Sequence, residues 1–240
     1  DLTARLAKYN YLPKEFIQLE IGKGITLNGW MQKPVNFDPN KKYPLLMVQY
    51  SGPDSQEVLD KFEIDWEFAL AQEGYIVACV DGRGTGARGR EWRKCTYMNL
   101  GILESDDQIA AAKAFGKYSY IDASRIGIWG WSFGGYMTLL SLCRGEGTFK
   151  AGVAIAPVTD WRFYDSIYTE RYLRTPQENP EGYRKGAPLA LADRLKGNLL
   201  IIHGSADDNV HLQNTMDFTE KLVHRPSNKY DEYIPTYHSL

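Results

Sequence analysis

Residues 125–142 read RIGIWGWSFGGYMTLLSL, and this stretch decides the fold. An apolar run at 125–129 leads into Gly130-Trp131-Ser132-Phe133-Gly134, and residues 135–142 then have the composition of a buried helix. A Gly-x-Ser-x-Gly pattern between a strand and a helix is typical of a sharp turn that raises the serine hydroxyl above a sheet. Glycines are needed there because side chains would strike the neighbouring backbone. Although glycine-rich serine loops also arise by chance, this context predicts that Ser132 is a nucleophile.

Outward from this turn, short apolar runs alternate with helical patterns, as in a mostly parallel sheet covered by helices on both faces. The runs are nearly unbroken, which is typical of strands buried on both faces. We predict strands at 44–50, 75–80, 125–129, 151–156 and 198–202, and a last strand at 229–234. Residues 16–21 and 25–31 instead alternate apolar and polar side chains across Gly22-Lys23-Gly24, which predicts an antiparallel hairpin at the sheet's edge.

Four helices are predicted between the strands. Residues 65–73, 135–142 and 212–223 have helical patterns, and Ser105 with Gln108 forms a capping box ahead of an apolar stripe. Residues 161–196 are rich in aromatic residues, arginine and proline and lack a sustained period. We interpret them as a long excursion over the edge of the sheet, and such excursions often carry function.

The composition excludes several classes of protein. With 240 residues, 43% of them hydrophobic, the chain is long enough for one well-buried core. No stretch approaches the roughly 20 apolar residues of a membrane helix, so we expect no membrane span in this segment. The net charge of −2 comes from interspersed acids and bases, which argues against nucleic acid as a partner. Cys79, Cys95 and Cys143 match no zinc-site spacing, and we interpret Cys79 and Cys143 as core residues. We expect neither a metal nor a cofactor.

A serine nucleophile needs a general base and an acid that orients the base. In the α/β-hydrolase fold these residues follow in the order serine, acid, histidine. A loop with Asp207 and Asp208 follows the predicted strand 198–202, and His238 follows the predicted strand 229–234, so the order is satisfied. We therefore predict an α/β-hydrolase fold, a mostly parallel, doubly wound α/β sheet with antiparallel N-terminal edge strands. It should be one structural domain, with residues 1–43 as the edge hairpin and lead-in and residues 44–240 as the catalytic part.

Three other histidines compete with His238 for the role of base. His203 belongs to a strand end and is expected to be structural, while His224 falls in the last turn of a helix, where a cation is favourable. His211 is the stronger rival because it lies near the two aspartates in the sequence. A metal cluster at this loop would lack the rest of a ligand set.

Residues 84–89, Gly-Thr-Gly-Ala-Arg-Gly, follow a predicted strand and match half of a dinucleotide-binding fingerprint. The fingerprint also needs a helix with small apolar residues directly after the loop, whereas the charged residues 90–94 follow here. A nucleotide-binding oxidoreductase stays an alternative from a different class.

Taken together, five segments closely resemble the dipeptidyl peptidase IV branch of the prolyl oligopeptidase family, and the resemblance covers essentially the whole chain. The segments are Tyr50-Ser51-Gly52-Pro53, Asp81-Gly82-Arg83-Gly84, Gly130-Trp131-Ser132-Phe133-Gly134-Gly135-Tyr136, Tyr164-Asp165-Ser166-Ile167-Tyr168-Thr169-Glu170-Arg171-Tyr172 and His203-Gly204-Ser205-Ala206-Asp207-Asp208-Asn209-Val210.

The resemblance implies a role for individual residues. By it, Ser132 is the nucleophile, Asp207 rather than Asp208 is the acid, and His238 is the base. It implies an oxyanion hole made by the Tyr50 hydroxyl and the Phe133 N–H, donors that face the oxygen that gains charge. It also implies a pocket for the substrate's penultimate side chain, formed by Val158, Trp161, Tyr164, Tyr168 and Val210. Asn209 is implied to donate a hydrogen bond to a substrate carbonyl.

The resemblance finally implies an activity, that of a serine exopeptidase releasing N-terminal dipeptides with penultimate proline or alanine through an acyl-enzyme. A tripeptidyl peptidase, an acyl-aminoacyl peptidase and an esterase are alternative enzymes of the same fold, and a non-catalytic interaction domain is an alternative of a different functional class. Members of the family carry a β-propeller ahead of the hydrolase, so we expect this chain to belong to a longer protein. Its expected partners are that propeller and a peptide substrate. The resemblance favours an extracytoplasmic location, periplasmic or at the cell surface, and is compatible with a homodimer.

Overall fold

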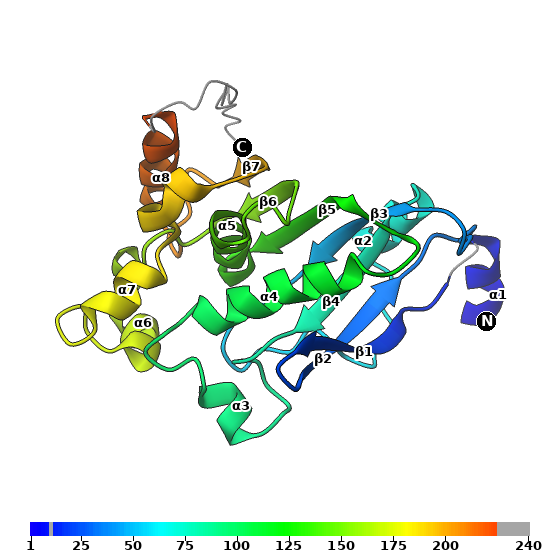
Figure 1. The fold of residues 1–240 in the computed structure, drawn as a ribbon, viewed down its shortest axis with the longest axis horizontal. Coiled ribbons are helices and arrows are strands. Elements are labelled where there is room, and N and C mark those ends of the chain that lie inside the picture. The colour runs from blue at the N-terminus through cyan, green and yellow to red at the C-terminus, as the bar shows by residue number, and fades with distance from the viewer. Residues whose placement is uncertain (10–11, 225–240) are drawn as a thin grey trace.

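The computed structural model describes residues 1–9 and 12–224, with a seven-stranded sheet at its centre (Figure 1). The strands are β1 Glu15–Gly22, β2 Ile25–Gln32, β3 Tyr43–Val48, β4 Ile76–Asp81, β5 Ile121–Trp131, β6 Ala151–Ile155 and β7 Asn198–Ile202. Their order is β1-β2-β4-β3-β5-β6-β7, and the pairings from β4 through to β7 are parallel. The predicted mostly parallel sheet is confirmed. The last predicted strand, at 229–234, lies outside the described residues.

β1 and β2 form the predicted antiparallel hairpin at one edge of the sheet. Leu19 pairs with Leu27 and both side chains are buried, so one face of the hairpin joins the core. The turn uses Gly22 and Gly24 at φ of +95° and +71°, values that glycine adopts without strain. β2 then pairs antiparallel with β4 and attaches the hairpin to the parallel strands.

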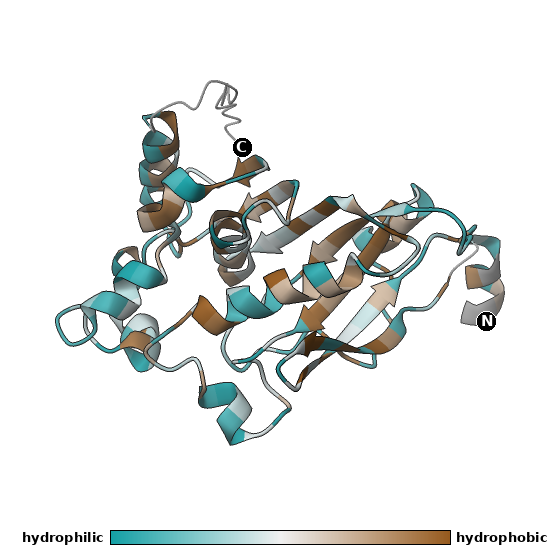
Figure 2. Cartoon of the chain, in the orientation of Figure 1, coloured by the Kyte–Doolittle hydropathy of each residue, from teal (hydrophilic) through white to brown (hydrophobic). Residues whose placement is uncertain are grey.

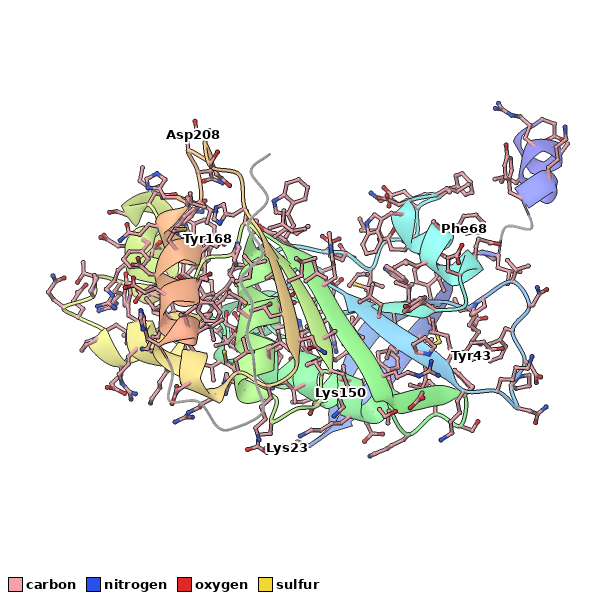
Figure 3. All side chains as sticks on the ribbon, turned by 90° about the horizontal axis from the view of Figure 1, so that it is seen from above. Lys23, Tyr43, Phe68, Lys150, Tyr168 and Asp208 are labelled. Atoms are coloured by element: carbon pink, nitrogen blue, oxygen red, sulfur yellow. The ribbon has the colours of Figure 1, made fainter. Side chains whose placement is uncertain are left out.

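Helices cover both faces of the sheet, as the sequence predicts. The α-helices of the described residues are α1 Leu2–Leu6, α2 Trp66–Gln72, α3 Arg90–Lys94, α4 Ile102–Phe115, α5 Phe133–Arg144, α6 Ser166–Leu173, α7 Pro180–Lys185 and α8 Gln213–Val223. Figure 2 shows hydrophobic residues concentrated along the strands, and hydrophilic residues on the outer helices. Figures 1 and 3 show α4 and α5 on one face of the sheet and α2 on the other. β4 is buried at every residue because it lies between these layers.

α4 begins at Ile102, ahead of the predicted capping box, so the interpretation of Ser105 as its N-cap was wrong. Gly101 takes the N-cap position with φ of +89°, and the Ser105 hydroxyl donates to the Gly101 carbonyl oxygen at 2.6 Å. Gln108 Nε2 donates to Ser51 Oγ at 3.1 Å and so ties the helix to the loop after β3. Both polar side chains are buried. Ser105 and Gln108 are therefore polar because they make hydrogen bonds in the interior. They do not mark the start of the helix.

The long segment 161–196 contains more regular structure than predicted. It holds α6, α7 and two 3₁₀ turns at Trp161–Phe163 and Pro188–Arg194. Figure 1 shows α6 and α7 beyond α5, at one end of the sheet. Asp165 caps α6 by accepting from the Tyr168 N–H at 2.7 Å. Helices of eight and six residues are too short to show a clear period in the sequence.

The glycine-rich residues 84–89 pack against the loop after β3. The Gly86 N–H donates to the Ser55 carbonyl oxygen at 2.8 Å. A Cβ atom at Gly86 would lie 3.0 Å from the Asp54 carbonyl oxygen, so close backbone contact explains that glycine. α3 follows with five residues, none of them buried, instead of the packed helix that a dinucleotide fingerprint requires.

Three compositional expectations concern the interior and the surface. Cys79 and Cys143 are buried, as expected, and Cys95 is exposed. Within the part of the chain that the structure describes, no helix is long and apolar enough to cross a membrane. In the same part, no three His, Cys, Asp or Glu side chains are grouped so that they could hold a metal ion.

A buried carboxyl group, Glu104, lies in the first turn of α4. Burial raises the pKa of Glu104 to about 8, against the opposing effect of backbone N–H groups and of Arg144. The carboxyl therefore stays protonated in the folded chain at pH values where the unfolded chain, with an ordinary pKa of about 4.3, has released the proton. The sign follows from linkage: stability is unaffected below about pH 4.3 and falls as the pH rises from there toward 8.

Glu104→Gln should therefore raise the free energy of unfolding at alkaline pH and change this free energy little near pH 4.5. We expect a gain of several kcal/mol at pH 8, because a pKa raised from about 4.3 to about 8 is worth about 1.4 kcal/mol per unit, and hence a Tm higher by about 5–15 °C. Thermal unfolding followed at pH 4.5 and pH 8 measures both values. Glu20→Gln, at an exposed position on β1, controls for the loss of a charge. A gain of equal size at both pH values would contradict the role of ionisation.

Candidate active site

The turn between β5 and α5 holds Ser132 at the carboxyl end of the central strands. β5 ends at Trp131, α5 begins at Phe133, and Ser132 between them has φ of 58° and ψ of −117°. Residues other than glycine rarely adopt a positive φ, and such strain gathers at functional sites. The Ser132 N–H donates to the Ile155 carbonyl oxygen at 2.8 Å, and the Tyr136 N–H to the Ser132 carbonyl oxygen at 2.9 Å. The predicted strand-turn-helix geometry is present.

The glycines around Ser132 allow backbone segments to approach closely. A Cβ atom at Gly130 would strike the backbone of Gly134, and one at Gly135 would lie 2.5 Å from the Ile155 carbonyl oxygen. A Cβ atom at Gly134 would lie 2.5 Å from the Gln49 carbonyl oxygen. These contacts bring the turn against both β6 and the loop after β3. The steric reason that the sequence suggests for the glycines is therefore correct.

The loop after β3 lies beside the start of α5. Gln49 Nε2 donates to the Gly134 carbonyl oxygen at 2.8 Å, which fixes the loop against the turn. The ring of Tyr50 packs on Phe133 with 6.0 Å between centroids. Partial burial raises the pKa of Tyr50, so its hydroxyl keeps its proton at neutral pH and can donate a hydrogen bond.

The loop after β7 gives its two aspartates different surroundings. Asp207 Oδ1 accepts from the N–H groups of Asn209 at 3.1 Å and Val210 at 3.0 Å, so this carboxylate is held in one orientation. Asp208 is exposed, and Figure 3 shows it at the tip of the loop. Of the two carboxylates, that of Asp207 is thus the one fixed by the backbone of its own loop.

The described histidines differ in their partners. His203 has a partner for each ring nitrogen, Thr215 Oγ1 on Nδ1 and the Val210 carbonyl oxygen on Nε2, both at 2.7 Å. Its Nε2 also lies 3.6 Å from Asp207 Oδ2, so this imidazole supports the acid loop, in line with the expected structural role. His211 is exposed ahead of α8, and His224 is the C-cap of α8. The predicted base, His238, lies outside the described residues.

Aromatic side chains from the segment 161–196 form one cluster with Phe133. Tyr168 stacks on Trp161 at 5.9 Å between centroids, and Tyr164 meets both rings edge to face. Figure 3 shows Tyr168 in this crowded region beside the sheet. Burial is also the main cause that raises the pKa of Tyr168. The hydrophobic cluster contains every apolar residue to which the resemblance assigns the substrate pocket: Val158, Trp161, Tyr164, Tyr168 and Val210.

Asn209 joins the acid loop to this cluster. Its Oδ1 accepts from the Tyr164 hydroxyl at 2.9 Å. The amide is oriented by that bond, with Nδ2 as its remaining donor.

One pair of positioning residues was missed by the sequence analysis. Thr159 donates from its N–H to Asn214 Oδ1 at 2.8 Å and from its hydroxyl to the Asn214 carbonyl oxygen at 2.7 Å. Both residues are buried, so these bonds tie the start of the aromatic segment to α8 and hence to the acid loop. Threonine and asparagine are common polar residues, and the sequence contains no signal that pairs positions so far apart.

A sheet of this topology, wound on both faces by helices and carrying a strained serine turn, defines the α/β-hydrolase class. The chain belongs to the prolyl oligopeptidase family, whose model matches residues 62–236. It is 52% identical over 236 residues to the probable dipeptidyl-aminopeptidase B of Neurospora crassa, covering 96% of this chain and 25% of that protein. The protein of the same name from Coccidioides posadasii is 49% identical over 236 residues and is covered to 26%, again with 96% of this chain.

A solved structure is more similar still. The crystal structure of Porphyromonas gingivalis dipeptidyl peptidase 4 matches with a TM-score of 0.91 and 67% identity, covering 92% of this chain and 32% of that one. The chain therefore spans about a quarter of the curated relatives named above and about a third of this solved chain. The predicted family and fold are confirmed.

Proposed function

We propose that the full-length protein containing this chain is a serine exopeptidase that releases N-terminal dipeptides whose second residue is proline or alanine. The observation that carries the proposal is the strained turn that holds Ser132 beside the aromatic cluster. The names of the similar proteins, dipeptidyl-aminopeptidase B and dipeptidyl peptidase 4, support the substrate class.

The proposed mechanism uses Ser132, Asp207 and His238 as a triad. His238 takes the hydroxyl proton as Ser132 Oγ attacks the carbonyl carbon of the substrate's second residue. Asp207 orients the imidazole and stabilises the imidazolium that forms. Collapse of the tetrahedral intermediate breaks the peptide bond, and His238 returns the proton to the departing amine. A water molecule, deprotonated in turn by His238, then attacks the ester, which frees the dipeptide and restores the Ser132 hydroxyl.

The proposed oxyanion hole combines the Tyr50 hydroxyl with the Phe133 N–H. Phe133 is the first residue of α5, where backbone N–H groups have no partner within the helix. The packing of the Tyr50 ring on the Phe133 ring supports this pairing, because it brings the two residues that supply the donors together. Donors held in place before the reaction stabilise the developing negative charge without having to reorganise.

The aromatic cluster is proposed as the pocket for proline or alanine. Rigid aromatic walls suit a flat ring, and apolar surface removed from water favours binding. Asn209 is proposed to donate from Nδ2 to a substrate carbonyl, and the bond from the Tyr164 hydroxyl to its Oδ1 holds the amide in one orientation.

Release of a dipeptide requires a second site that binds the free amine two residues from the cut. We propose that this site lies on a β-propeller elsewhere in the protein, since the chain spans only about a quarter of its named curated relatives. Residues 1–43 then serve as the edge hairpin and lead-in to a catalytic part at 44–240. Family resemblance also supports an extracytoplasmic location, periplasmic or at the cell surface, and is compatible with a homodimer.

Chromogenic Gly-Pro and Ala-Pro anilides with free or acetylated amino termini test this proposal on the full-length protein. We expect at least a hundredfold higher kcat/KM for the free forms, because the amine contact positions the scissile bond. Equal cleavage of both forms would favour an esterase, and preference for the acetylated form an acyl-aminoacyl peptidase. Preference for a tripeptide reporter would indicate a tripeptidyl peptidase. Absence of both turnover and fluorophosphonate labelling would indicate a non-catalytic domain.

A further inference from the structure

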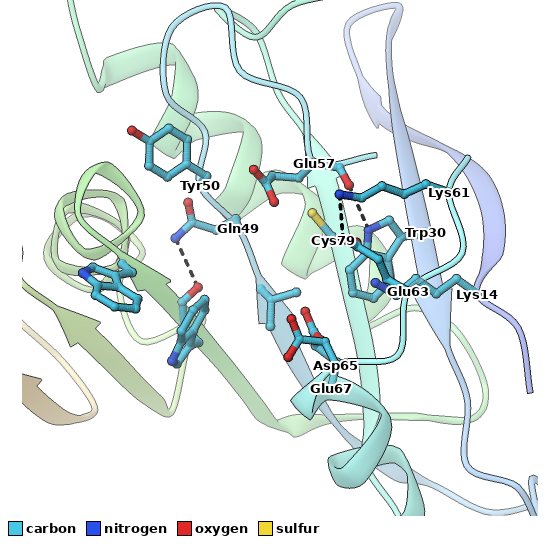
Figure 4. Close-up of a pocket in the computed structure, with 13 residues that line it drawn as sticks. Lys14, Trp30, Gln49, Tyr50, Glu57, Lys61, Glu63, Asp65, Glu67 and Cys79 are labelled. Carbon is cyan, nitrogen blue, oxygen red and sulfur yellow. Dashed lines mark hydrogen bonds and ion pairs between the residues drawn. The ribbon is translucent and has the colours of Figure 1, made fainter. Parts of the chain in front are cut away.

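A cavity of about 320 Å³, separate from the aromatic cluster, has Tyr50 in its lining (Figure 4). Its aromatic walls are Trp30, Trp129, Trp131 and Tyr50. Trp129 and Trp131 are two residues apart on β5 and so lie on the same face of the sheet. Trp131 is also the residue before Ser132, and its side chain is 59% exposed. The cavity therefore lies next to the turn that holds Ser132.

The charges in this cavity do not balance. Glu57, Glu63, Asp65 and Glu67 line it together with only two ammonium groups, those of Lys14 and Lys61. Lys61 is already paired with Glu63 at 2.6 Å, and the Asp65 carboxylate caps α2 by accepting from the Trp66 N–H at 2.7 Å.

Glu57 and Glu67 are thus the carboxylates left for a ligand. Figure 4 shows both pointing toward the same space. Within the described residues, the carboxylate of Glu57 has no donor, and one oxygen of Glu67 is buried without a hydrogen-bond partner. Partial burial raises the pKa of both groups, a penalty that a nearby cation would relieve.

The walls of the cavity also suit a positive charge. The Lys14 ammonium lies 3.9 Å from the centroid of the Trp30 ring, so one cation already rests on an aromatic face here. Such contacts are attractive because the face of an aromatic ring is electronegative, and they strengthen when water is excluded. Trp129 and Trp131 offer further rings beside Glu57 and Glu67.

The position relative to Ser132 indicates which part of a substrate would reach the cavity. The acyl part of the substrate is proposed to occupy the aromatic cluster at Trp161, Tyr164 and Tyr168. The leaving part extends from the other side of the attacked carbonyl, and Trp131, which precedes Ser132 and lines the cavity, is proposed to lie beneath it. Resting on the proposed peptidase function, we propose that this cavity binds a lysine or arginine side chain at the first or second residue of the leaving peptide, through Glu57, Glu67 and the tryptophan walls.

The test compares peptides that begin with Ala-Pro and differ only in whether lysine or its uncharged analogue norleucine stands at the first or the second position after the cut. With the full-length protein we expect kcat/KM to be about tenfold higher for lysine at one of these positions. The preference should shrink as salt is raised, because screening weakens ion pairing. This measurement on the unmodified protein does not depend on any variant folding.

The variant Glu57→Gln/Glu67→Gln should lower the lysine-to-norleucine ratio to about one. Glu20→Gln/Glu220→Gln removes two exposed carboxylates elsewhere and should keep the ratio, which controls for net charge. Labelling of Ser132 by a fluorophosphonate shows that each variant is folded at the site.

The outcomes separate this proposal from the function on which it rests. Cleavage of Ala-Pro anilide without any preference for lysine would overturn the cavity proposal and leave the peptidase function standing. No cleavage of the anilide would overturn the peptidase function and the cavity proposal with it. A double variant that loses the distinction between free and acetylated reporters, with the lysine preference intact, would assign the cavity to the substrate's amino terminus and overturn the proposal made here.

Discussion

Ser132→Ala should lower kcat for Ala-Pro anilide by about a millionfold in the full-length protein, while the fold stays intact. The hydroxyl oxygen is the attacking atom in the proposed mechanism, and no neighbouring side chain can supply it at the same point of the turn. The turn itself depends on the close contacts of Gly130, Gly134 and Gly135, which the substitution leaves in place. Steady-state kinetics should show the loss of kcat, fluorophosphonate labelling should be absent, and thermal unfolding should give an unchanged Tm.

A matched control is Ser119→Ala, which removes a serine hydroxyl from an exposed turn. It should leave kcat, labelling and Tm within experimental error. Substantial turnover by a Ser132→Ala protein with unchanged Tm would show that another residue is the nucleophile.

Asp207→Asn should lower kcat by about ten-thousandfold, the second largest effect that we expect. The loop geometry should survive because an asparagine oxygen can still accept from the N–H groups of Asn209 and Val210. The amide nitrogen, however, donates where the carboxylate accepts. It would favour the wrong tautomer of the proposed base His238 and could not stabilise the imidazolium.

The neighbouring aspartate provides the control for this second prediction. Asp208→Asn makes the same chemical change one residue away, at an exposed position, and should alter kcat by less than about threefold. Circular dichroism and Tm should match between the two variants. If Asp208→Asn proved the more damaging of the two, the acid would have to be reassigned.

The features that could be predicted from the sequence depend on steric contacts between nearby residues or on a clear pattern of apolar residues along the chain. The serine turn is one, because Gly130, Gly134 and Gly135 are required by backbone contacts within a few residues of Ser132 and with adjacent strands. The buried strands are another, because a sheet covered on both faces needs nearly unbroken apolar runs, as β4 shows with five apolar residues ahead of Asp81.

The features that could not be predicted depend on contacts between distant parts of the chain. Ser105 looks like a helix cap, yet its hydroxyl bonds within α4. α6 and α7 are too short for their periods to be seen, and tertiary packing of the aromatic cluster stabilises that region.

In the candidate site, too, some features could be predicted from the sequence and others could not. Its aromatic pocket residues were assigned through family resemblance, since aromatic residues at helical spacing are equally consistent with ordinary packing. The cavity of Glu57 and Glu67 was not anticipated at all, because its walls come from β2, β5 and α2. The assignments of Ser132, Asp207 and His238 stay predictions.

The positive φ of Ser132 also bears on how the chain can change over evolutionary time. An L-residue in this conformation costs on the order of 1–3 kcal/mol, and glycine would relieve it. If Ser132 is the nucleophile, as proposed, selection for stability and selection for turnover act in opposite directions at this position. A lineage that no longer needed the reaction would lose nothing by drifting to glycine here, and would gain thermal tolerance by doing so. In the proposed mechanism, the serine at position 132 is therefore kept for its chemistry at a cost in stability.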